Sequence, residues 1–264
     1  MKKKILMAIL ALFLVSAFSY SDTFSLKVNY FVPRGLSSST SPDSLWKIEH
    51  DNMDYGKSDF QGVSFGLSYE YFLTRVFSLE FSIDAFYSKT ANGSYRDYLG
   101  FEYDSDFWAV PADLDNYMDV DTFSTDHSLT VSIMPIQISL KIAPFGRQGR
   151  FIPYFGGGIG VYFWTVRMEG DLIDFSDEYE YQTIDDYFLP VYPIYFVDAE
   201  EKNKLAFGFH VLGGFMLSLS KTLTLDIGAK YNVAKGKMSD AFLGFDPFDL
   251  GGLQLSLGLN YRFR

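Results

Sequence analysis

The sequence of 264 residues contains no cysteine, which excludes disulfide bonds and thiolate metal sites. Histidine is scarce as well, because three residues are scattered along the chain without the spacing of metal ligands. Beyond residue 18, no apolar run approaches the roughly 20 residues that a membrane-spanning helix needs. We therefore predict no metal, no cofactor and no spanning helix in the mature chain.

The amino terminus has the three parts of a secretory signal. Lysines at positions 2–4 precede an apolar run over residues 5–18, and small residues follow at positions 17, 19 and 21. A membrane anchor is the alternative, but the run is shorter than a spanning helix. We predict a cleaved signal peptide at residues 1–21 and one mature domain at residues 22–264.

Charge and aromatic content narrow the class of protein. The net charge of −11 becomes −14 when the three signal lysines are removed, since 19 basic residues then face 33 acidic ones. Nucleic acid is therefore not an expected partner. Aromatic residues make up 19% of the chain, and amphipathic rings gather where proteins meet a membrane interface. An exported chain of this kind without a spanning helix favours a closed β-barrel.

Period-two alternation of apolar and polar residues recurs along the mature chain. The alternating runs cover residues 24–32, 62–71, 78–87, 129–142, 152–166, 205–217, 223–233 and 253–263. We predict an all-β fold: a closed, antiparallel, up-and-down transmembrane β-barrel of about eight strands. The alternation changes parity at Met134–Pro135, where we expect a β-bulge.

The connections alternate between short and long. Short ones at 74–75, 143–150 and 219–222 contain arginine or lysine and no acid, whereas long ones span 34–60, 89–127, 167–203 and 234–250. Segments 89–127 and 167–203 together hold 20 of the 33 carboxylates against four basic residues. This layout predicts short periplasmic turns, long acidic extracellular loops and both termini in the periplasm.

The polar positions decide which face points outward. In the run from residue 62 they are Gly62, Ser64, Gly66 and Ser68, which suit a narrow interior better than a water-facing surface. A soluble barrel such as a lipocalin would reverse the faces. With the apolar face toward lipid, the predicted interior residues are Lys27, Glu70, Glu80, Asp84, Lys141, His210, Asp226, Lys230 and Arg262. We expect a structural network of paired charges, with a polar path for a small solute, a proton relay or a catalytic centre as alternatives.

Three further features are ambiguous. Gly156–Gly160 superficially suggests a phosphate loop but lies inside an alternating strand. The carboxylates at 174, 177, 178 and 180 form either a solvated surface or a divalent-cation site. The apolar segment 187–197 folds over the mouth, extends a strand, contacts a ligand or adds a hairpin that would give ten strands.

Four segments carry a family resemblance. The closing strand ends with Ser256, Gly258, Tyr261 and Phe263 in the polar, glycine, apolar, aromatic pattern of outer-membrane assembly signals. Together with 134–141, 153–160 and 207–214, it resembles the small bacterial outer-membrane β-barrels, namely the OmpA transmembrane domain and OmpW-like proteins.

The resemblance implies an integral protein of the cell outer membrane. Its partners would be outer-membrane lipid, lipopolysaccharide and, during insertion, the barrel-assembly machinery. The long loops and an interior filled by its own residues further predict a non-enzymatic platform for surface interaction, or a passage for small apolar solutes, with no catalytic residue. The alternative is a lipid-modifying enzyme of the lipid A acyl hydrolase or acyltransferase type, because His127–Ser128 resembles the residue pair of lipid A deacylases.

Overall fold

The structure is a computed structural model that describes residues 22–35, 44–147 and 149–263. The predicted signal peptide at 1–21 lies outside the described residues. The strands are β1 (Thr23–Pro33), β2 (Gly62–Phe72), β3 (Phe77–Tyr103), β4 (Asp106–Pro111), β5 (Thr122–Ile142), β6 (Phe151–Ile173), β7 (Tyr179–Gln182), β8 (Phe188–Ser218), β9 (Leu223–Gly236), β10 (Phe248–Asp249) and β11 (Gly252–Arg262). The helical elements are α2 (Leu45–Asn52) and the 3₁₀ turns η2 (Lys57–Phe60), η3 (Ala112–Tyr117) and η4 (Asp240–Phe242).

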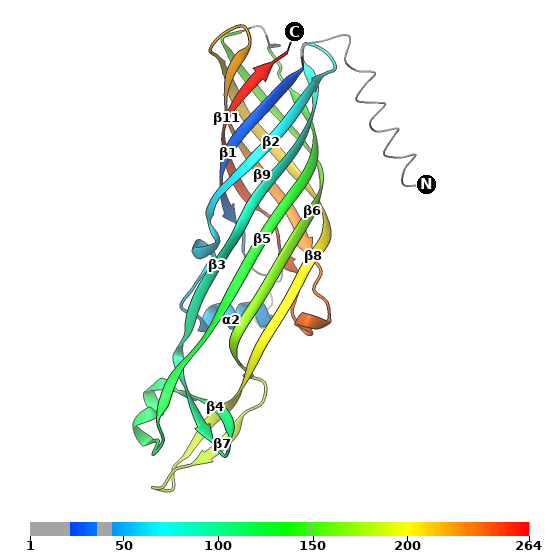
Figure 1. Cartoon of the computed structure of the whole chain (residues 1–264). Helices are drawn as coiled ribbons and strands as arrows, with labels where there is room; N and C mark the ends of the chain where they lie inside the picture. Colours follow the sequence, from blue (N-terminus) through cyan, green and yellow to red (C-terminus); the bar gives the residue numbers. More distant parts are fainter. Residues whose placement is uncertain (1–21, 36–43, 148, 264) are drawn as a thin grey trace.

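The strands form a ring of antiparallel pairings. The order is β1, β2, β3, β5, β6, β8, β9 and β11, and β11 pairs with β1 again. Figure 1 shows these strands inclined around a common axis. Within the described residues the sheet has eleven strands, three more than the eight that form the ring. The additional strands β4, β7 and β10 lie in segments that we predicted to be loops.

The short connections lie where the sequence placed them. Thr74 closes the turn between β2 and β3, because its hydroxyl accepts from the backbone N–H of Val76 at 3.1 Å and of Phe77 at 2.9 Å. Such side-chain caps compete with strand pairing and so end it. The turns from β5 to β6 and from β8 to β9 lie at the same end of the ring (Figure 1).

The prediction of long loops at 89–127 and 167–203 is wrong. These two segments, which we call the extension, are mostly strand, because β3, β5, β6 and β8 run on for 27, 21, 23 and 31 residues. In contrast, β1, β2 and β11 have 11 residues each. The apolar segment 187–197 belongs mainly to β8, which pairs there with β7 and β4. Figure 1 shows the extension projecting well beyond the shorter strands.

The two faces of β5 exchange their character along the strand. Near the turn end, Ile136, Ile138 and Leu140 are exposed on the outer face, and the residues between them are buried and polar. Toward the extension, the inner face carries Leu129 and Ile133, while the outer face becomes Ser, Thr and Asp. The β5–β6 register continues without a shift through Pro135. The predicted bulge at Met134–Pro135 is therefore wrong. The alternation in the sequence changes parity there because the apolar residues move from the outer face of β5 to its inner face.

A similar exchange occurs on β3. Ile83 is exposed on the outer face near the turn end, whereas Asn92 and Arg96 occupy the outer face in the extension. Two register shifts lie close to this level, between Phe86 and Lys89 on β3 and between Trp164 and Val166 on β6, and a third lies between Ser94 and Leu99 in the extension. Bulges at this level allow the long strands to bend as they leave the ring.

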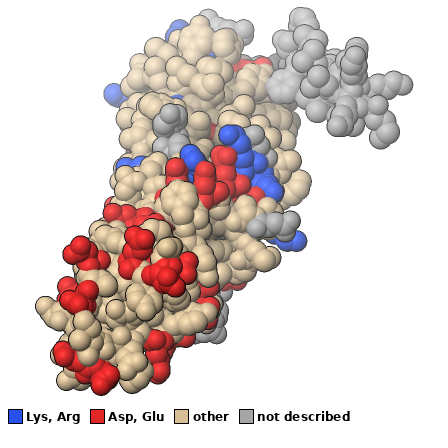
Figure 2. All heavy atoms as spheres, turned by 60° about the horizontal axis from the view of Figure 1, so that its bottom comes forward, with Lys and Arg blue, Asp and Glu red and all other residues tan. Residues whose placement is uncertain are grey.

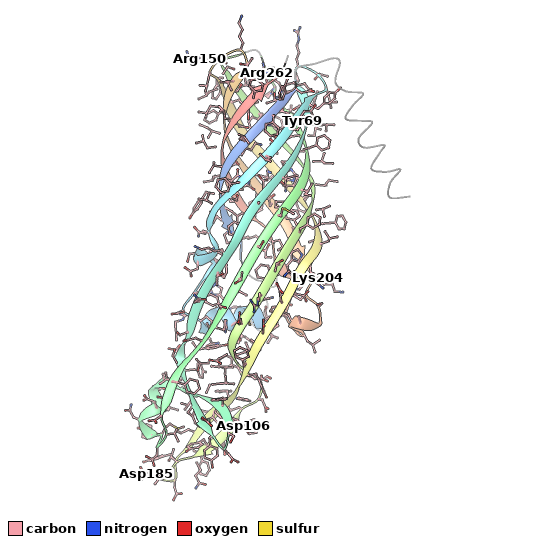
Figure 3. All side chains as sticks on the ribbon, viewed as in Figure 1. Tyr69, Asp106, Arg150, Asp185, Lys204 and Arg262 are labelled. Carbon is pink, nitrogen blue, oxygen red and sulfur yellow. The ribbon has the colours of Figure 1, made fainter. Side chains whose placement is uncertain are left out.

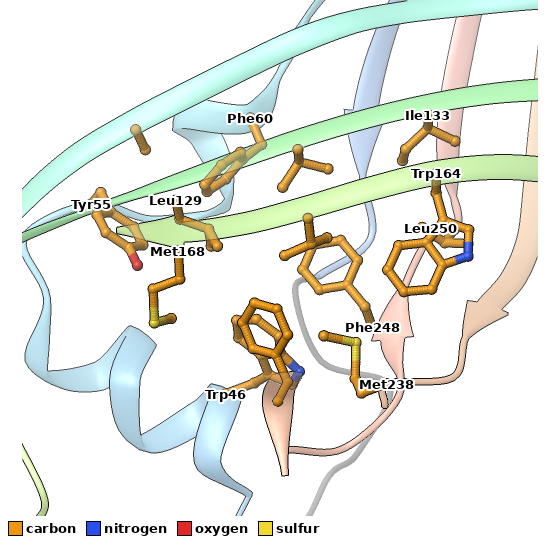
Figure 4. Close-up of a cluster of buried hydrophobic side chains, with 14 of the residues drawn as sticks. Trp46, Tyr55, Phe60, Leu129, Ile133, Trp164, Met168, Met238, Phe248 and Leu250 are labelled. Atoms are coloured by element: carbon orange, nitrogen blue, oxygen red, sulfur yellow. The ribbon is translucent and has the colours of Figure 1, made fainter. Parts of the chain in front are cut away.

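An apolar core fills the ring at the level where the shorter strands end. Side chains from α2, from the segment around β10 and from the strand walls converge there (Figure 4). Trp46 of α2 is 1% exposed and stacks edge-on against Phe248 at 5.3 Å between ring centroids. A second, smaller cluster within the extension comprises Phe101, Val110, Leu189 and Val191. No helix in the described part of the chain has the length and apolar character to cross a membrane.

Candidate functional site

A network of buried charges occupies the ring near its turn end. Lys141 lies at its centre, with its ammonium 3.2 Å from Glu70 and 3.0 Å from Glu80. Glu70 also binds Arg147 at 2.7 Å, and Glu80 also binds Lys27 at 3.1 Å. The five charged groups come from four strands that follow one another in the ring, β1, β2, β3 and β5, and from the turn after β5, so the network ties neighbouring strands together. Buried ions need such partners, because desolvation opposes their charged state.

A second group of polar side chains lies next to this network. Lys230 bridges Asp84 at 2.9 Å and the side-chain oxygen of Gln137 at 2.7 Å. Gln137 in turn donates to Asn232 at 2.8 Å and to the hydroxyl of Tyr162 at 2.9 Å. This layer marks the boundary between the charged interior and the apolar core, which lies on the side of the extension.

The structure brings together most of the predicted interior residues. Lys27, Glu70, Glu80 and Lys141 share one network, and Asp84 pairs with Lys230. The remaining three have separate contacts: Asp226 accepts from Tyr154 at 2.7 Å, His210 bonds Ser139 at 2.8 Å, and Arg262 lies 5.8 Å from the Phe72 ring.

Sequence reasoning missed two groups that complete the network. We assigned Arg147 to a turn, but its side chain folds back into the ring of strands. Its guanidinium group lies 4.5 Å from the centre of the Phe72 aromatic ring. Nothing in the local sequence indicates this reversal. Gln137 and Asn232 were also missed, although they occupy inward positions of alternating strands and the same periodicity could have identified them.

The interior of the ring is filled. The charged network encloses a cavity of about 20 Å³ lined by Lys27, Tyr154 and Asp226 among others. A second cavity of about 20 Å³ lies beside Phe31 and Tyr162. Each has room for about one water molecule. In the described residues the interior is therefore packed with side chains rather than shaped as an open passage.

The comparisons with known proteins agree with the resemblance seen in the sequence. No protein-family model matches the chain, and no curated protein does. Among solved structures, the chain is similar to the outer-membrane protein OprG from Pseudomonas aeruginosa, with 11% identity, a TM-score of 0.46, and coverage of 94% of this chain and 99% of OprG. It is also similar to Neisserial surface protein A, with 16% identity, a TM-score of 0.38, and coverage of 93% and 98%.

A third similar structure is a major outer-membrane protein from Thermus thermophilus, with 12% identity, a TM-score of 0.38, and coverage of 92% of this chain and 100% of that one. The similar solved structures are bacterial outer-membrane proteins, the class that the sequence resembles. Identities this low do not bear on shared function.

The closing strand β11 places its motif residues on both faces. Tyr261 and Phe263 are exposed and contact each other edge-on, with ring centroids 5.0 Å apart. Gly258 points inward next to Lys27, and a Cβ at this position would lie 3.0 Å from the Lys27 stem. Ser256 is half-buried and pairs with Asn29 of β1. Glycine at 258 thus leaves room for a charged side chain of the network.

The geometry does not support the pairing of His127 with Ser128 that an esterase would need. The two residues are neighbours on β5, so they point to opposite faces. His127 is buried, with Nε2 2.8 Å from the Tyr55 hydroxyl and Nδ1 3.1 Å from the Asp171 carbonyl. Ser128 lies on the other face, and its hydroxyl donates to the Glu169 carbonyl at 3.3 Å.

The extension is strongly acidic. Residues 97–126 contain nine Asp or Glu and no Lys or Arg. Figure 2 shows carboxylates gathered over this part, and Figure 3 places Asp106 and Asp185 at the far end from Arg150 and Arg262. Within the described residues, no three His, Asp or Glu side chains could together hold a metal ion.

The four carboxylates that suggested a cation site do not converge on one point. Asp174 accepts from Ser176 at 3.0 Å, Asp177 from the Tyr179 hydroxyl at 3.1 Å and Glu178 from the Tyr192 hydroxyl at 2.9 Å. These bonds fix the turn between β6 and β7 and its packing against β8.

Proposed function

We propose that this chain is a non-enzymatic, integral outer-membrane protein. Its ring of strands is a closed transmembrane barrel with a filled interior, and the barrel anchors a stiff acidic extension outside the cell. The turn end faces the periplasm. The extension is the part that meets other molecules.

The exchange of faces along β3 and β5 is the observation that carries this proposal. On the turn side of the exchange, large apolar residues such as Phe65 and Phe207 are 64% and 81% exposed, which water would disfavour and acyl chains favour. Just beyond the exchange on β3 and β5, outward residues such as Asn92, Arg96 and Thr130 are polar or charged, and apolar residues such as Leu129 point inward. A boundary of this kind at one level of several strands is typical of the edge of a membrane.

The filled interior supports an anchor rather than a pore. In the charged layer, Lys27, Lys141, Arg147 and Lys230 oppose Glu70, Glu80, Asp84 and Asp226. These opposite charges compensate one another, and ions passing through would have to break several of these pairs. The apolar core with Trp46 and Phe248 closes the barrel on the other side.

The extension supports a role in contact with external partners. Its apolar cluster around Phe101 and the pairing of β4 with β8 hold it in shape. A shallow groove near its end combines Glu102, Asp104, Asp119 and Asp121 with the exposed rings of Phe107 and Phe123. A surface of one sign attracts partners of the opposite sign, so this one favours cationic over anionic partners.

Two measurements test the membrane assignment together. Gel migration with and without boiling in detergent reports whether the mature chain forms a heat-stable barrel. Protease treatment of whole cells expressing the protein should then cleave within residues 89–127 or 167–203 while the barrel strands survive. A mature chain that is folded and monodisperse in buffer without detergent would contradict the assignment.

Planar-bilayer recordings of the refolded protein test the filled interior. We expect no large, steady conductance, because the charged layer and the apolar core both block the lumen. A stable water-filled conductance would contradict the anchor. A mass change of lipid A on expression, abolished in a His127→Ala variant, would instead favour the enzyme alternative.

A further inference from the structure

The helix α2 covers the end of the barrel opposite the short turns, which we call the mouth. It lies beyond the ends of the shorter strands, and the bridge between Met53 and Tyr95 fixes its carboxyl end to β3 (Figure 1). Trp46 anchors the helix at the other end, because its indole N–H donates to the Asp246 carbonyl at 2.8 Å. Figure 4 shows the Trp46 ring directed into the apolar core. The helix therefore separates this core from the medium.

Glu49 is the charged residue of α2 that points into this core. It is 6% exposed, and its carboxylate accepts from the Tyr95 hydroxyl at 2.7 Å. Tyr95 also accepts from the backbone N–H of Ile173 on β6 at 3.3 Å. The Tyr95 hydroxyl thus joins α2 to two strands of the wall, β3 and β6.

Glu49 has no cationic partner among the described residues. Lys47 of the same helix pairs with Asp51 on the solvent side, and Arg96 donates to the Asp51 carbonyl at 2.7 Å. Glu80, in contrast, has two lysine ammonium groups within 3.1 Å. Burial without a cation raises the pKa of Glu49 to about 7, and the hydrogen bond from Tyr95 opposes this rise only in part.

The other titratable groups around Glu49 come from three elements. Tyr55 follows α2, and burial raises its pKa, as it does for Tyr95 on β3. His127 on β5 lies edge-on to both rings, and burial lowers its pKa, so it is neutral near pH 7. The backbone carbonyl of Asp171 on β6 contacts the His127 ring, and burial raises the pKa of the Asp171 carboxyl group.

Two further ionisable residues near Glu49 contact other groups. Asp54 is occupied by the backbone N–H of Ser94 at 2.9 Å. His50, the next residue on α2, lies against Gly56. Among the groups that face Glu49 in the described part of the chain, none supplies a positive charge when the carboxyl group ionises. Ionisation therefore leaves an uncompensated charge in the apolar core.

We propose that α2 is a proton-sensitive latch: protonated Glu49 holds the helix against Tyr95, and loss of the proton releases the helix from the mouth of the barrel. The proposal uses the proposed function only to place the mouth outside the cell. In acid the core is covered. As the medium approaches neutrality, the apolar core that contains Leu129, Val131 and Trp164 becomes accessible to it.

The direction of the effect follows from linkage. The carboxyl group binds its proton more tightly in the closed state than in the released state, where its pKa returns toward 4.5. The closed state is therefore fully favoured below pH 4.5 and loses this advantage as the pH rises to about 7. Protonation of His127 acts in the opposite direction, because its pKa is lowered in the closed state. The two groups can thus be separated by mutation.

A single-cysteine reporter tests the latch, because the chain has no cysteine of its own. Met53 is 0% exposed beneath the end of α2, so Met53→Cys should react with a maleimide only when the helix leaves. The Glu49→Gln variant keeps an acceptor for Tyr95 and does not ionise. The Asp51→Asn variant changes an exposed carboxylate on the same helix and serves as the matched control.

We expect the labelling rate, divided by that of the Glu49→Gln chain at each pH, to rise roughly a hundredfold from pH 4.5 to pH 7.5. The Asp51→Asn chain should show the same rise. An equal pH dependence with and without Glu49 would overturn the latch, and so would the absence of any rise. If the cysteine variant does not fold, acrylamide quenching of Trp46 in a Trp108→Phe, Trp164→Phe chain replaces it. Boiling-dependent gel migration of each variant tests the barrel separately from the latch.

Discussion

Lys141 on β5 lies diagonally opposite Glu80 on the neighbouring strand β3, and the ammonium and the carboxylate lie 3.0 Å apart with side chains 1% and 2% exposed. A pair buried this deeply is difficult to break, because the partner left behind keeps its charge without compensation. The walls of the barrel are therefore coupled through ions as well as through backbone pairing.

Replacing Lys141 with methionine should destabilise the barrel strongly. Glu70 would retain Arg147 and Glu80 would retain Lys27, but both carboxylates lose the cation that they share. Removal of one partner of a buried pair costs about 3–5 kcal/mol. Urea unfolding in detergent micelles measures the change. Lys221→Met, on an exposed turn, is the control and should change the unfolding free energy by less than about 0.5 kcal/mol.

A glycine on β9 makes room for another interior contact. A Cβ at Gly228 would lie 2.6 Å from the Tyr154 hydroxyl, which donates to Asp226. Gly228→Ala should therefore displace Tyr154 and cost about 1–3 kcal/mol of unfolding free energy. Gly213→Ala is the matched control, because its nearest neighbour would lie at 3.6 Å.

A double-mutant cycle identifies the cause of the Gly228 effect. In a Tyr154→Phe chain the oxygen that the new methyl group meets is absent. The penalty of Gly228→Ala should be smaller in that chain than in the original. An equal penalty in both would show that glycine is needed for the backbone of β9 and not for Tyr154.

The ring of strands could be predicted because period-two alternation is a local property of each strand. Residues such as Leu26 and Leu259 show which face a strand turns to lipid, and the structure exposes both. The pairing of Lys141 with Glu70 and Glu80 could not be predicted. It depends on the register of β2, β3 and β5 around the ring, which alternation within one strand does not specify.

The exchange of faces on β5 was missed because, toward the extension, the strand reverses the rule that identified the barrel. Leu129 and Ile133 are apolar and point inward, and the positions between them are polar and point outward. Next to the outward-facing Ile136 and Ile138, this pattern looks in the sequence like a shift of the alternation by one residue. A bulge and an exchange of environment give the same parity change in sequence, and only the pairing with β6 separates them.

Charge placed on the outer face of β3 tests the level of the membrane. Ile83 is 47% exposed on the proposed lipid-facing side, and Asn92 is exposed on the same strand in the extension. Ile83→Arg should cost about 2–4 kcal/mol, since arginine near the middle of a bilayer is unfavourable. Asn92→Arg should be nearly neutral. Both are measured by unfolding from lipid vesicles, and similar costs for both would place the membrane boundary elsewhere.

The apolar cluster of the extension should unfold separately from the barrel. Phe101 is 0% exposed and packs with Val110, Leu189 and Val191, with its ring 5.5 Å from that of Tyr181. Truncation of a buried phenylalanine to alanine removes about 3–5 kcal/mol of packing. In Phe101→Ala, hydrogen exchange should therefore become faster at the amides of β4 and β7, since these pair only within the extension.

The barrel of the Phe101→Ala chain should remain intact, because its strands are held by the charged network and by the core around Trp46. Boiling-dependent gel migration should therefore be unchanged, and exchange in β1 and β11 should stay slow. Phe145→Ala is the control, because this ring is 84% exposed on a turn at the opposite end. Loss of protection in β1 together with β4 would show that barrel and extension fold as one cooperative unit, and the extension would then contribute to the stability of its own anchor.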